Sequence, residues 1–430
     1  MAQLVQRYLD DIVAEYAPVT DGALADYIPE LTEVDPTGFG LTLSASDGYL
    51  YRAGDAQTEF TIQSISKPFT YALALELSGQ DAVDAKIGVE PSGDAFNEIS
   101  VDEKTKTPKN AMINAGAIAA VSLVPGRTPD ERFARIQEFY SACAGRPLEL
   151  DDAVYRSEKA TGNRNRAIAY MLTSFGVLDD DPDEVLDVYF RQCSLRVTSV
   201  DLARMAATLA RGGVNPQTGR RVADSRVVQR TLSVMVTCGM YNGAGDWVSA
   251  VGMPAKSGVG GGILAVLPGQ LGIGVYSPLL DGRGNSVRGV LVCRALSDRL
   301  GLHFLNVSRE SRSTIRAIYQ ASPGIRVYEM HGDLMFAGAE RVLRSVDRES
   351  DDFSVGILDV TRVDTINDSA RALLANMSAT LRAAGKLGLL VDPDAAVILP
   401  GRGYDDVAFT DLDSALAAAG KWLQTHGPGQ

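Results

Sequence analysis

The spacing of apolar residues predicts a largely helical region that is followed by strands. Residues 61–79 place apolar side chains at a helical period, and residues 194–213 do the same before a Gly-Gly pair that ends the pattern. Residues 251–278 are instead typical of a strand, a Gly-rich turn and a second strand. Strands that follow a mostly helical middle favour an α+β fold over a parallel doubly wound sheet.

A separate α/β pattern fills the end of the chain. The segment Ala321–Gly324, which contains a Pro-Gly pair, is typical of a break between elements. After it, predicted strands alternate with predicted helices, which favours a small α/β module. The strands are expected at 325–332, 355–360 and 386–392, and the helices at 337–350, 367–385 and 412–424. The pattern therefore predicts two domains, 1–318 and 323–430.

Composition and charge narrow the class of protein. The chain has 430 residues, of which 45% are hydrophobic and 22% charged, as in an ordinary soluble globular protein. This excludes a disordered, collagen-like or coiled-coil chain. The 41 basic and 54 acidic residues give a net charge of −13. Nucleic acid is not expected as the main partner, because phosphate backbones are bound by clustered Lys and Arg.

The histidines and cysteines exclude several kinds of site. The first histidine is His303, so neither a Ser-His-Asp hydrolase nor a histidine zinc site is possible before it. The four cysteines are isolated, without a CxxC pair, and are typical of free thiols in a reducing compartment. The start of the chain lacks signal-peptide features, and the nearly apolar stretch 111–124 is shorter than the roughly 20 residues that span a bilayer. We expect a cytoplasmic protein without a membrane partner, a metal or a cofactor.

Ser64 and Lys67 form the first candidate catalytic pair. Positions i and i+3 at a helix start share one face, so the lysine amine can reach the serine hydroxyl. A serine needs a base to become nucleophilic, and a desolvated lysine can provide one where no histidine is near. Pro68 is tolerated only in a first helical turn, which agrees with this placement. Taken alone, the pair also fits a capping serine beside a solvated lysine.

The second candidate motif is Lys256-Ser257-Gly258, which comes just before the Gly-rich turn. A Ser-x-x-Lys motif with a later Lys-Ser/Thr-Gly is the pairing of serine penicillin-recognising enzymes and class A β-lactamases. The Lys-Ser-Gly triplet alone also fits a turn at a strand edge. Both motifs in this order favour catalysis, although the Ser-Asp-Asn triplet of a class A β-lactamase is missing.

Eight stretches, in order, resemble the serine-dependent glutaminases, which share the penicillin-recognising fold. They run from residue 25 to residue 289 and include both candidate motifs. The stretches are ADYIPEL (25–31), QSISKPF (63–69), MINAGAI (112–118), SEKATGNRN (157–165), DVYFRQCS (187–194), CGMYNGAG (238–245), PAKSGVGGGI (254–263) and GNSVRG (284–289). The resemblance implies an α+β, serine β-lactamase-like catalytic domain that hydrolyses the side-chain amide of L-glutamine to glutamate and ammonia.

The resemblance also implies a role for each matched residue. Ser64 is expected to attack the amide, with Lys67 as its base, and Tyr241 to pass a proton to the leaving ammonia. The backbone amides of Ser64 and Val259 are expected to form the oxyanion hole. Glu158 suits the α-ammonium of glutamine. The remaining matched positions, expected to act in catalysis or to hold the substrate, are Tyr27, Asn114, Asn165 and Tyr189.

Simpler interpretations of some of these residues stay open. Asn114 also fits a turn, Tyr189 beside Phe190 fits a core aromatic, and Glu158 beside Lys159 fits a surface ion pair. Cys193 and Cys238 lie inside matched stretches but are predicted to be buried small apolar residues.

The end of the chain resembles a STAS domain, the type found in anti-sigma-factor antagonists and sulphate-transporter tails. The stretch VGILDVTRVDTINDSARALL (355–374) carries the resemblance, and Ser369 falls on the position of a phosphorylatable serine. The chain has Asn-Asp-Ser-Ala where Asp-Ser-Ser-Gly is usual, so Ser369 also fits a plain helix-start residue. The resemblance implies a protein partner for this domain.

Two other functions remain as alternatives at this stage. One is a different acyl hydrolase of the penicillin-recognising fold with the same Ser-Lys pair. The other is a regulatory binding protein, which would not need Ser64, Lys67 and Tyr241, all of which are present. Relatives in the glutaminase family form dimers and tetramers, so a homodimer or homotetramer is expected.

Overall fold

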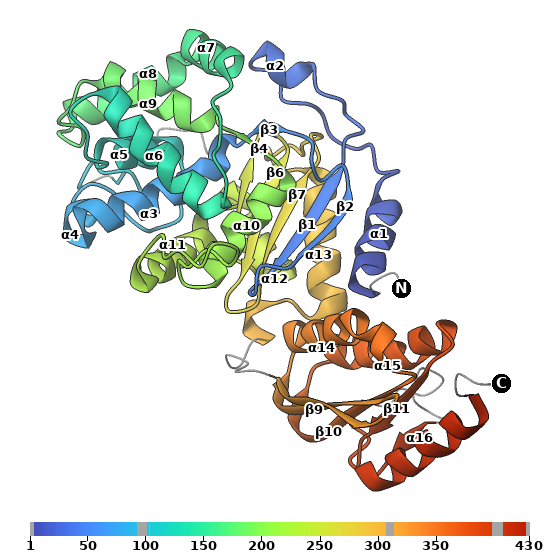
Figure 1. Cartoon of the computed structure of the whole chain (residues 1–430). Helices are drawn as coiled ribbons and strands as arrows, with labels where there is room; N and C mark the ends of the chain where they lie inside the picture. The colour runs from blue at the N-terminus through green and yellow to red at the C-terminus, as the bar shows by residue number, and fades with distance from the viewer. Residues whose placement is uncertain (1–3, 93–100, 103, 307–313, 398–406, 427–430) are drawn as a thin grey trace. The chain divides into compact units, whose positions relative to one another are not determined.

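The computed structural model describes residues 4–92, 101–102, 104–306, 314–397 and 407–426. These residues form two compact units. One is Leu9–Ala295, and the other consists of the described residues of Met1–Tyr8 and Leu296–Gln430. Figure 1 shows the elements of each unit along the chain.

The first unit is built around a five-stranded antiparallel sheet with the strand order β2-β1-β7-β6-β5. Its strands come from both ends of the unit, and β1 pairs directly with β7. The whole helical region is therefore inserted between the second and the third strand of the sheet. The strands are β1 (Gly40–Ala45), β2 (Leu50–Gly54), β5 (Ala255–Gly258), β6 (Gly262–Leu267) and β7 (Leu271–Tyr276). The short strands β3 (Phe60–Thr61) and β4 (Arg196–Val197) pair separately.

Helix α10 (Ser199–Ala210) packs on this sheet at very short range. The side chain of Thr198 and that of Asp201 cap its start reciprocally, in a capping box. A Cβ atom on Gly274 of β7 would lie 2.1 Å from the carbonyl oxygen of Ser199, and one on Gly272 2.3 Å from the amide of Ala207. The absence of side chains at these two positions of β7 is what lets the helix backbone approach the strand.

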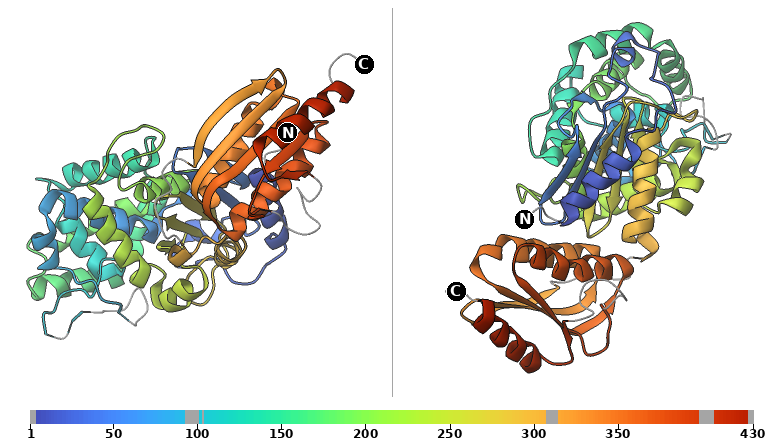
Figure 2. Two further views of the ribbon diagram at one scale, coloured as in Figure 1. Left: turned by 90° about the horizontal axis from the view of Figure 1, so that it is seen from below. Right: turned by 90° about the vertical axis from the view of Figure 1, so that its right-hand side faces the viewer.

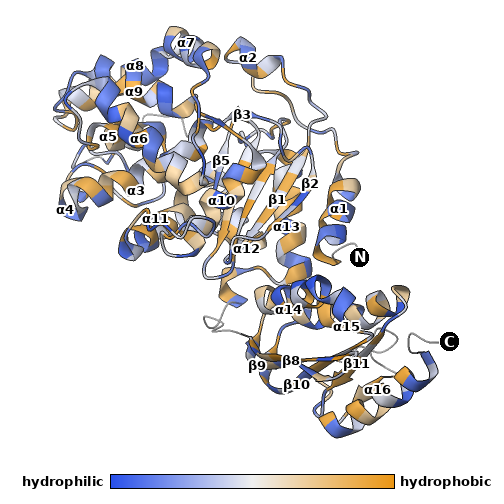
Figure 3. Cartoon of the chain, in the orientation of Figure 1, coloured by the Kyte–Doolittle hydropathy of each residue, from blue (hydrophilic) through white to orange (hydrophobic). Residues whose placement is uncertain are grey.

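Most of the remaining helices of the first unit, among them α3, α5, α6, α8, α9 and α11, share a largely apolar core. Helices α3 and α5 are buried over most of their lengths, as expected of helices that are apolar on all sides. Figure 3 shows hydrophobic strands in both units, and every residue of β6 and β7 is buried. The helices are α2 (Pro29–Thr32), α3 (Lys67–Ser78), α4 (Gln80–Asp84), α5 (Asn114–Ser122), α6 (Pro129–Ala144), α7 (Asp152–Thr161), α8 (Asn163–Ser174), α9 (Pro182–Cys193), α11 (Ser225–Cys238) and α12 (Ala244–Ala250). Helices α1 (Leu4–Tyr16) and α13 (Val287–Leu300) each contain residues of both units.

The second unit is a mixed sheet with the strand order β12-β11-β10-β9-β8. Strands β9 to β12 are parallel to their neighbours, whereas β8 pairs with β9 in an antiparallel hairpin. Figures 1 and 2 show α14 and α15 on one face of the sheet and α16 on the other. The elements are β8 (Ile315–Ser322), β9 (Ile325–Leu334), α14 (Phe336–Arg348), β10 (Val355–Ile366), α15 (Asp368–Ala383), β11 (Leu387–Val391), β12 (Ala408–Phe409) and α16 (Leu412–His426).

The structure differs from the sequence interpretation at three points. Residues 251–278 form three strands, because the Pro268-Gly269 turn divides the second predicted strand into β6 and β7. The strand expected at 355–360 continues to Ile366, with irregular pairing beyond Asp359. The segment Ala321–Gly324, expected to separate two domains, holds the end of β8 and the Pro323-Gly324 turn of the β8–β9 hairpin, where Gly324 takes a positive φ of 83°.

Candidate active site

The candidate nucleophile lies at the entrance of the central helix α3. Ser64 belongs to a short 3₁₀ turn, Gln63–Ser66, that runs directly into α3 at Lys67. Ser64 is only 8% exposed. Its predecessor Gln63 has a φ of 48°, a backbone conformation that is uncommon for a non-glycine residue and tends to occur at functional sites. The turn thus presents the Ser64 hydroxyl at a helix amino terminus, where backbone amides can stabilise negative charge, while the Ser66 hydroxyl donates to the carbonyl oxygen of Gln63.

Lys67 is completely buried one turn further on. Its Nζ donates a hydrogen bond of 2.6 Å to Oδ1 of Asn114, and Nδ2 of Asn114 donates one of 2.9 Å to Oδ1 of Asn165. Burial lowers the pKa of Lys67 to about 8, an effect that nearby Cys193 partly opposes. At pH 7 this pKa leaves about a tenth of the amine neutral, against about 0.03% at the usual lysine pKa. Lys67 can therefore act as a base.

Tyr241 approaches the nucleophile from the other side. Its hydroxyl donates a 3.1 Å hydrogen bond to the carbonyl oxygen of Ser257 on β5. Burial raises the pKa of Tyr241, while a hydrogen bond that it shares with Ser64 acts in the opposite direction. Like Gln63, Tyr241 has a positive φ, of 55°. A phenol with a raised pKa keeps its proton at neutral pH and can serve as a proton donor.

The Gly-rich turn after β5 packs against the nucleophile turn. A Cβ atom on Gly260 would lie 2.6 Å from the carbonyl oxygen of Thr61, and one on Gly258 3.1 Å from that of Ile62. The glycines that flank Val259 therefore let the backbone of this turn come close to the segment that leads into Ser64.

The second end of the site is acidic. The hydroxyl of Tyr27 donates a 2.7 Å hydrogen bond to Oε1 of Glu158 and lies 3.3 Å from Oε1 of Gln63. Glu158 is 7% exposed, and its burial raises the pKa of the carboxyl group. Hydrogen bonds from Tyr27 and Gln63 lower this pKa, and the charge of Glu30 raises it further. A buried carboxylate near a second acidic residue is suited to binding a cation.

The segment that carries Tyr27 is held by a small apolar cluster of its own. Ile28 and Leu31 pack with Val154 of α7, and Val259 lies against this cluster. Tyr27 itself is 44% exposed, although its hydroxyl is bonded to the buried Glu158. Desolvation of that hydroxyl and the neighbouring carboxylate raise the pKa of Tyr27. The strap of residues 25–31 therefore links the Gly-rich turn to the acidic end of the site.

Tyr189 and Cys193 contribute one face of α9. Tyr189 is buried, and its pKa is raised by burial and then by Cys193 and Glu158. Cys193 lies with its Sγ 3.9 Å from Oγ of Ser66, and burial raises its pKa to about 12. All four cysteines are buried and free. Cys193 thus stays a protonated thiol in the wall behind the nucleophile turn.

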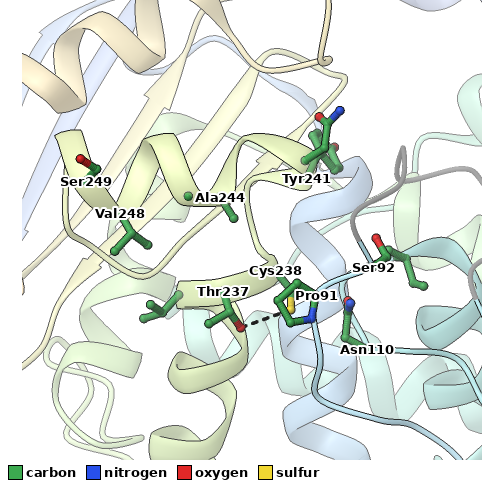
Figure 4. Close-up of a pocket in the computed structure, with 13 residues that line it drawn as sticks. Pro91, Ser92, Asn110, Thr237, Cys238, Tyr241, Ala244, Val248 and Ser249 are labelled. Atoms are coloured by element: carbon green, nitrogen blue, oxygen red, sulfur yellow. Dashed lines mark hydrogen bonds between the residues drawn. The ribbon is translucent and has the colours of Figure 1, made fainter. Parts of the chain in front are cut away.

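A cavity of about 560 Å³ lies on the α12 side of Tyr241 (Figure 4). Figure 4 shows Tyr241 and Asn110 in its wall, together with Thr237 and Cys238 at the end of α11. None of the described residues that line it carries a charge. The charged groups of the site, Lys67 and Glu158, are absent from this lining, so the cavity adjoins the site and is distinct from its polar part.

Comparison with known proteins gives the family. The glutaminase family model matches residues 22–305, more than half of the chain. The chain belongs to the glutaminase family. It is 52% identical over 307 residues to a glutaminase of Microcystis aeruginosa, which covers 71% of this chain and 91% of that one. It is 43% identical over 404 residues to a glutaminase of Corynebacterium glutamicum, covering 94% and 97%.

The solved structures agree with this family. The crystal structure of Mglu superposes with a TM-score of 0.71 at 44% identity, over 92% of this chain and 99% of that one. The glutaminase unit has the serine β-lactamase-like fold, with its antiparallel sheet interrupted by a helical region. Because 92% coverage extends well beyond residue 305, the similarity to Mglu includes most of the tail.

Sequence reasoning on this glutaminase missed two residues that the structure brings to the site. Gln63 precedes the nucleophile and bonds to Tyr27, and Lys256 lies fully buried against Tyr241. Both belong to matched stretches, so the signal was present, but neither received a role.

Among the described residues, no group of His, Cys, Asp and Glu side chains is arranged to hold a metal ion. No helix in the described ranges is long and apolar enough to cross a membrane.

Proposed function

We propose that the protein hydrolyses the side-chain amide of L-glutamine to L-glutamate and ammonia through an ester on Ser64. Membership of the glutaminase family supports the reaction. The observation that carries the mechanism is that Ser64, Lys67 and Tyr241 converge: the buried amine follows the serine by one helical turn, and the phenol shares a hydrogen bond with the same hydroxyl.

The residues divide the chemistry between them. The neutral amine of Lys67 accepts the proton of Ser64 as Oγ attacks the amide carbon, and the backbone amides of Ser64 and Val259 bind the oxyanion that forms. Tyr241 gives its proton to the leaving nitrogen, which departs as ammonia, and the proton held by Lys67 restores the phenol. Water then attacks the ester while Lys67 takes one of its protons. Lys67 returns that proton to Oγ of Ser64 as the ester bond breaks, and the new carboxyl group loses its remaining proton to water as glutamate leaves.

The acidic end of the site supplies the binding groups. Glu158 is placed to pair with the α-ammonium of glutamine, whose arrival would relieve the cost of a buried carboxylate. Tyr27 orients that carboxylate through its 2.7 Å hydrogen bond. Asn114, Asn165 and Tyr189 offer neutral donors for the α-carboxylate and the side-chain amide.

The second unit is proposed to be a STAS-like domain that binds a protein partner. Its mixed sheet with helices on both faces is compatible with that resemblance. Ser369 is only 2% exposed, and its hydroxyl donates to Oδ1 of Asn367, the residue that caps α15. A phosphate could not be added there without opening the helix start, so we do not assign phosphorylation to Ser369.

The boundary between the two domains is proposed to lie between Asn306 and Thr314. A cut between 318 and 323 would separate β8 from its partner β9. The family model ends at residue 305, which agrees with a boundary between Asn306 and Thr314.

We further propose an assembly of two or four copies and a cytoplasmic location, the latter in keeping with four free thiols. Sedimentation of the full chain and fractionation of cells test these two points.

Ser64→Ala is expected to lower ammonia release from L-glutamine by ~10³-fold or more, because the ester cannot form. Ser78→Ala is the matched control, since Ser78 lies at the other end of α3 and its hydroxyl bonds to the carbonyl oxygen of Leu123. Turnover is measured beside thermal melting. A folded Ser64→Ala protein with near wild-type turnover would rule out the ester mechanism.

Glu158→Gln is expected to raise KM for glutamine by about tenfold or more, with a smaller change in kcat, because the α-ammonium loses its charged partner. N-acetylglutamine and asparagine should be poor substrates, the latter because its amide is one methylene short of Ser64. Glu149→Gln, which breaks only an exposed ion pair with Arg196, is the control. Equal rates with glutamine and asparagine would contradict the assignment.

The pH dependence follows from Lys67. Because the base must be neutral and its pKa is lowered to about 8, kcat/KM should rise tenfold per pH unit below that value and level off above it. Initial rates in constant-ionic-strength buffers between pH 6 and 10 provide the measurement. A profile that is flat across pH 7–9 would exclude Lys67 as the base in the free enzyme.

A chain that ends at Asn306 is expected to fold and to keep kcat/KM within about threefold of the full-length value. A match of 307 residues covers 91% of the glutaminase of Microcystis aeruginosa. The rest of that protein is too short to hold a domain like this tail. Comparing kcat/KM and sedimentation of the two proteins is the test. Loss of activity together with loss of the folded state would mean that the tail completes the catalytic domain.

A further inference from the structure

Lys256 is a second buried lysine that the proposed mechanism does not use. It lies on β5, fully buried, with its Nζ 4.0 Å from the centre of the Tyr241 ring. The same Nζ donates a 2.7 Å hydrogen bond to the carbonyl oxygen of Ser257. A buried amine is costly unless its hydrogen bonds are satisfied, so an apolar residue of similar length would be the less costly occupant of a purely structural position.

Lys256 and Tyr241 share one anchor. The carbonyl oxygen of Ser257 accepts a hydrogen bond from the Tyr241 hydroxyl, at 3.1 Å, as well as the one from Lys256. The phenol is therefore held at two places, at its oxygen by Ser257 and over its ring face by the amine. This matters because Tyr241 sits in a strained backbone conformation, with a φ of 55°, at the start of a short 3₁₀ turn.

We propose that Lys256 is a positioning residue, whose amine holds the Tyr241 ring so that its hydroxyl faces Ser64 when the leaving nitrogen takes its proton. This inference rests on the proposed function, because it acts through the proton transfer assigned to Tyr241. It is separate from the roles of Lys67 and of the oxyanion hole, which Lys256 does not contact through any hydrogen bond of its side chain in the described structure.

The environment of Lys256 distinguishes positioning from a charge effect. Burial, and then the nearby charge of Lys67, hold the pKa of Lys256 well below its ordinary value. Its Nζ contacts the carbonyl oxygen of Ser257 and the ring face of Tyr241. The lowered pKa of Lys67 follows from its own burial, which Cys193 opposes, and not from Lys256. Replacing it should change the transfer of the proton through Tyr241 and leave the titration of Lys67 in place.

The test compares Lys256→Met with Lys86→Met. Lys86 is a matched control because its Nζ also donates to a backbone carbonyl at 2.7 Å, that of Val177, in the helical layer. For Lys256→Met we expect kcat to fall on the order of tenfold or more. This loss is smaller than the whole contribution of general acid catalysis, because the phenol is still present. KM should stay within about threefold, and the midpoint of the kcat/KM profile should not move. Lys86→Met should keep wild-type kcat.

A double-mutant cycle with Tyr241→Phe decides whether the effect runs through the phenol. If it does, adding Lys256→Met to Tyr241→Phe should lower kcat by less than about threefold, because the hydroxyl to be positioned is already gone. Full additivity of the two losses would overturn the proposal. Wild-type kcat in folded Lys256→Met would overturn it too.

Two further outcomes keep the tests separable. Wild-type kcat in Tyr241→Phe would contradict the proton transfer assigned to Tyr241, and with it the proposed mechanism. A lowered kcat in Tyr241→Phe together with wild-type kcat in Lys256→Met would contradict only the positioning role. If Lys256→Met does not fold, Lys256→Gln replaces it, since its amide keeps an N–H donor in the pocket. Lys256→Gln should lose less kcat than an apolar substitution does. Wild-type kcat in both Lys256→Gln and Lys256→Ala would overturn the inference.

Discussion

The desolvated amine of Lys67 is the constraint on which the rest of the site depends. A lysine at an ordinary pKa is a poor base at neutral pH, and burial is what brings its pKa to about 8. Lys67 is the first residue of α3, and both α3 and α5 are buried over most of their lengths. The buried amine requires an acceptor inside the core, and Asn114, the first residue of α5, supplies one at 2.6 Å. The helical layer thus leaves this amine buried and still hydrogen-bonded.

The sheet contributes the second half of the site through close backbone approach. The turn after β5 lies against the segment that leads into the nucleophile turn, since a Cβ atom on Gly260 would come within 2.6 Å of the carbonyl oxygen of Thr61. The strand then brings the Ser257 carbonyl, Lys256 and the amide of Val259 to the nucleophile turn. Because β1 and β7 pair although their residues are more than 200 positions apart, the sheet is fixed only when both ends of the unit have folded. The site is therefore a product of the complete unit.

Motifs predicted the family, and local periodicity predicted helices α3 and α10. Both kinds of prediction succeeded because each signal lies in residues that are neighbours in the sequence. The helix start at Lys67 and the cap at Thr198 need only local hydrogen bonds and the apolar period. Contacts between distant residues could not be predicted in this way. The bond from Tyr27 to Glu158 joins positions 131 apart, and the Pro-Gly pair at 323–324 has the same local sequence signal in a hairpin turn as in a domain break. Lys256 was part of a candidate motif but received no role of its own, because a strand-edge motif does not reveal which side chains it packs against.

The site holds basic groups beside Ser64 and Tyr241 and acidic groups beside Tyr27. Lys67 and Lys256 lie at the end beside Ser64, while Glu158, with Glu30 nearby, lies at the other. On the proposed mechanism this polarity orients glutamine, whose cationic group is drawn to Glu158 and whose neutral amide is left at the lysines. The product differs from the substrate in one respect, since its new carboxylate forms beside Lys67. A protonated Lys67 would retain that carboxylate, and a neutral one would not. On the proposed mechanism the lowered pKa of Lys67 therefore bears on two steps, because a larger neutral fraction of the amine is available as a base for attack and a smaller protonated fraction retains the glutamate that results.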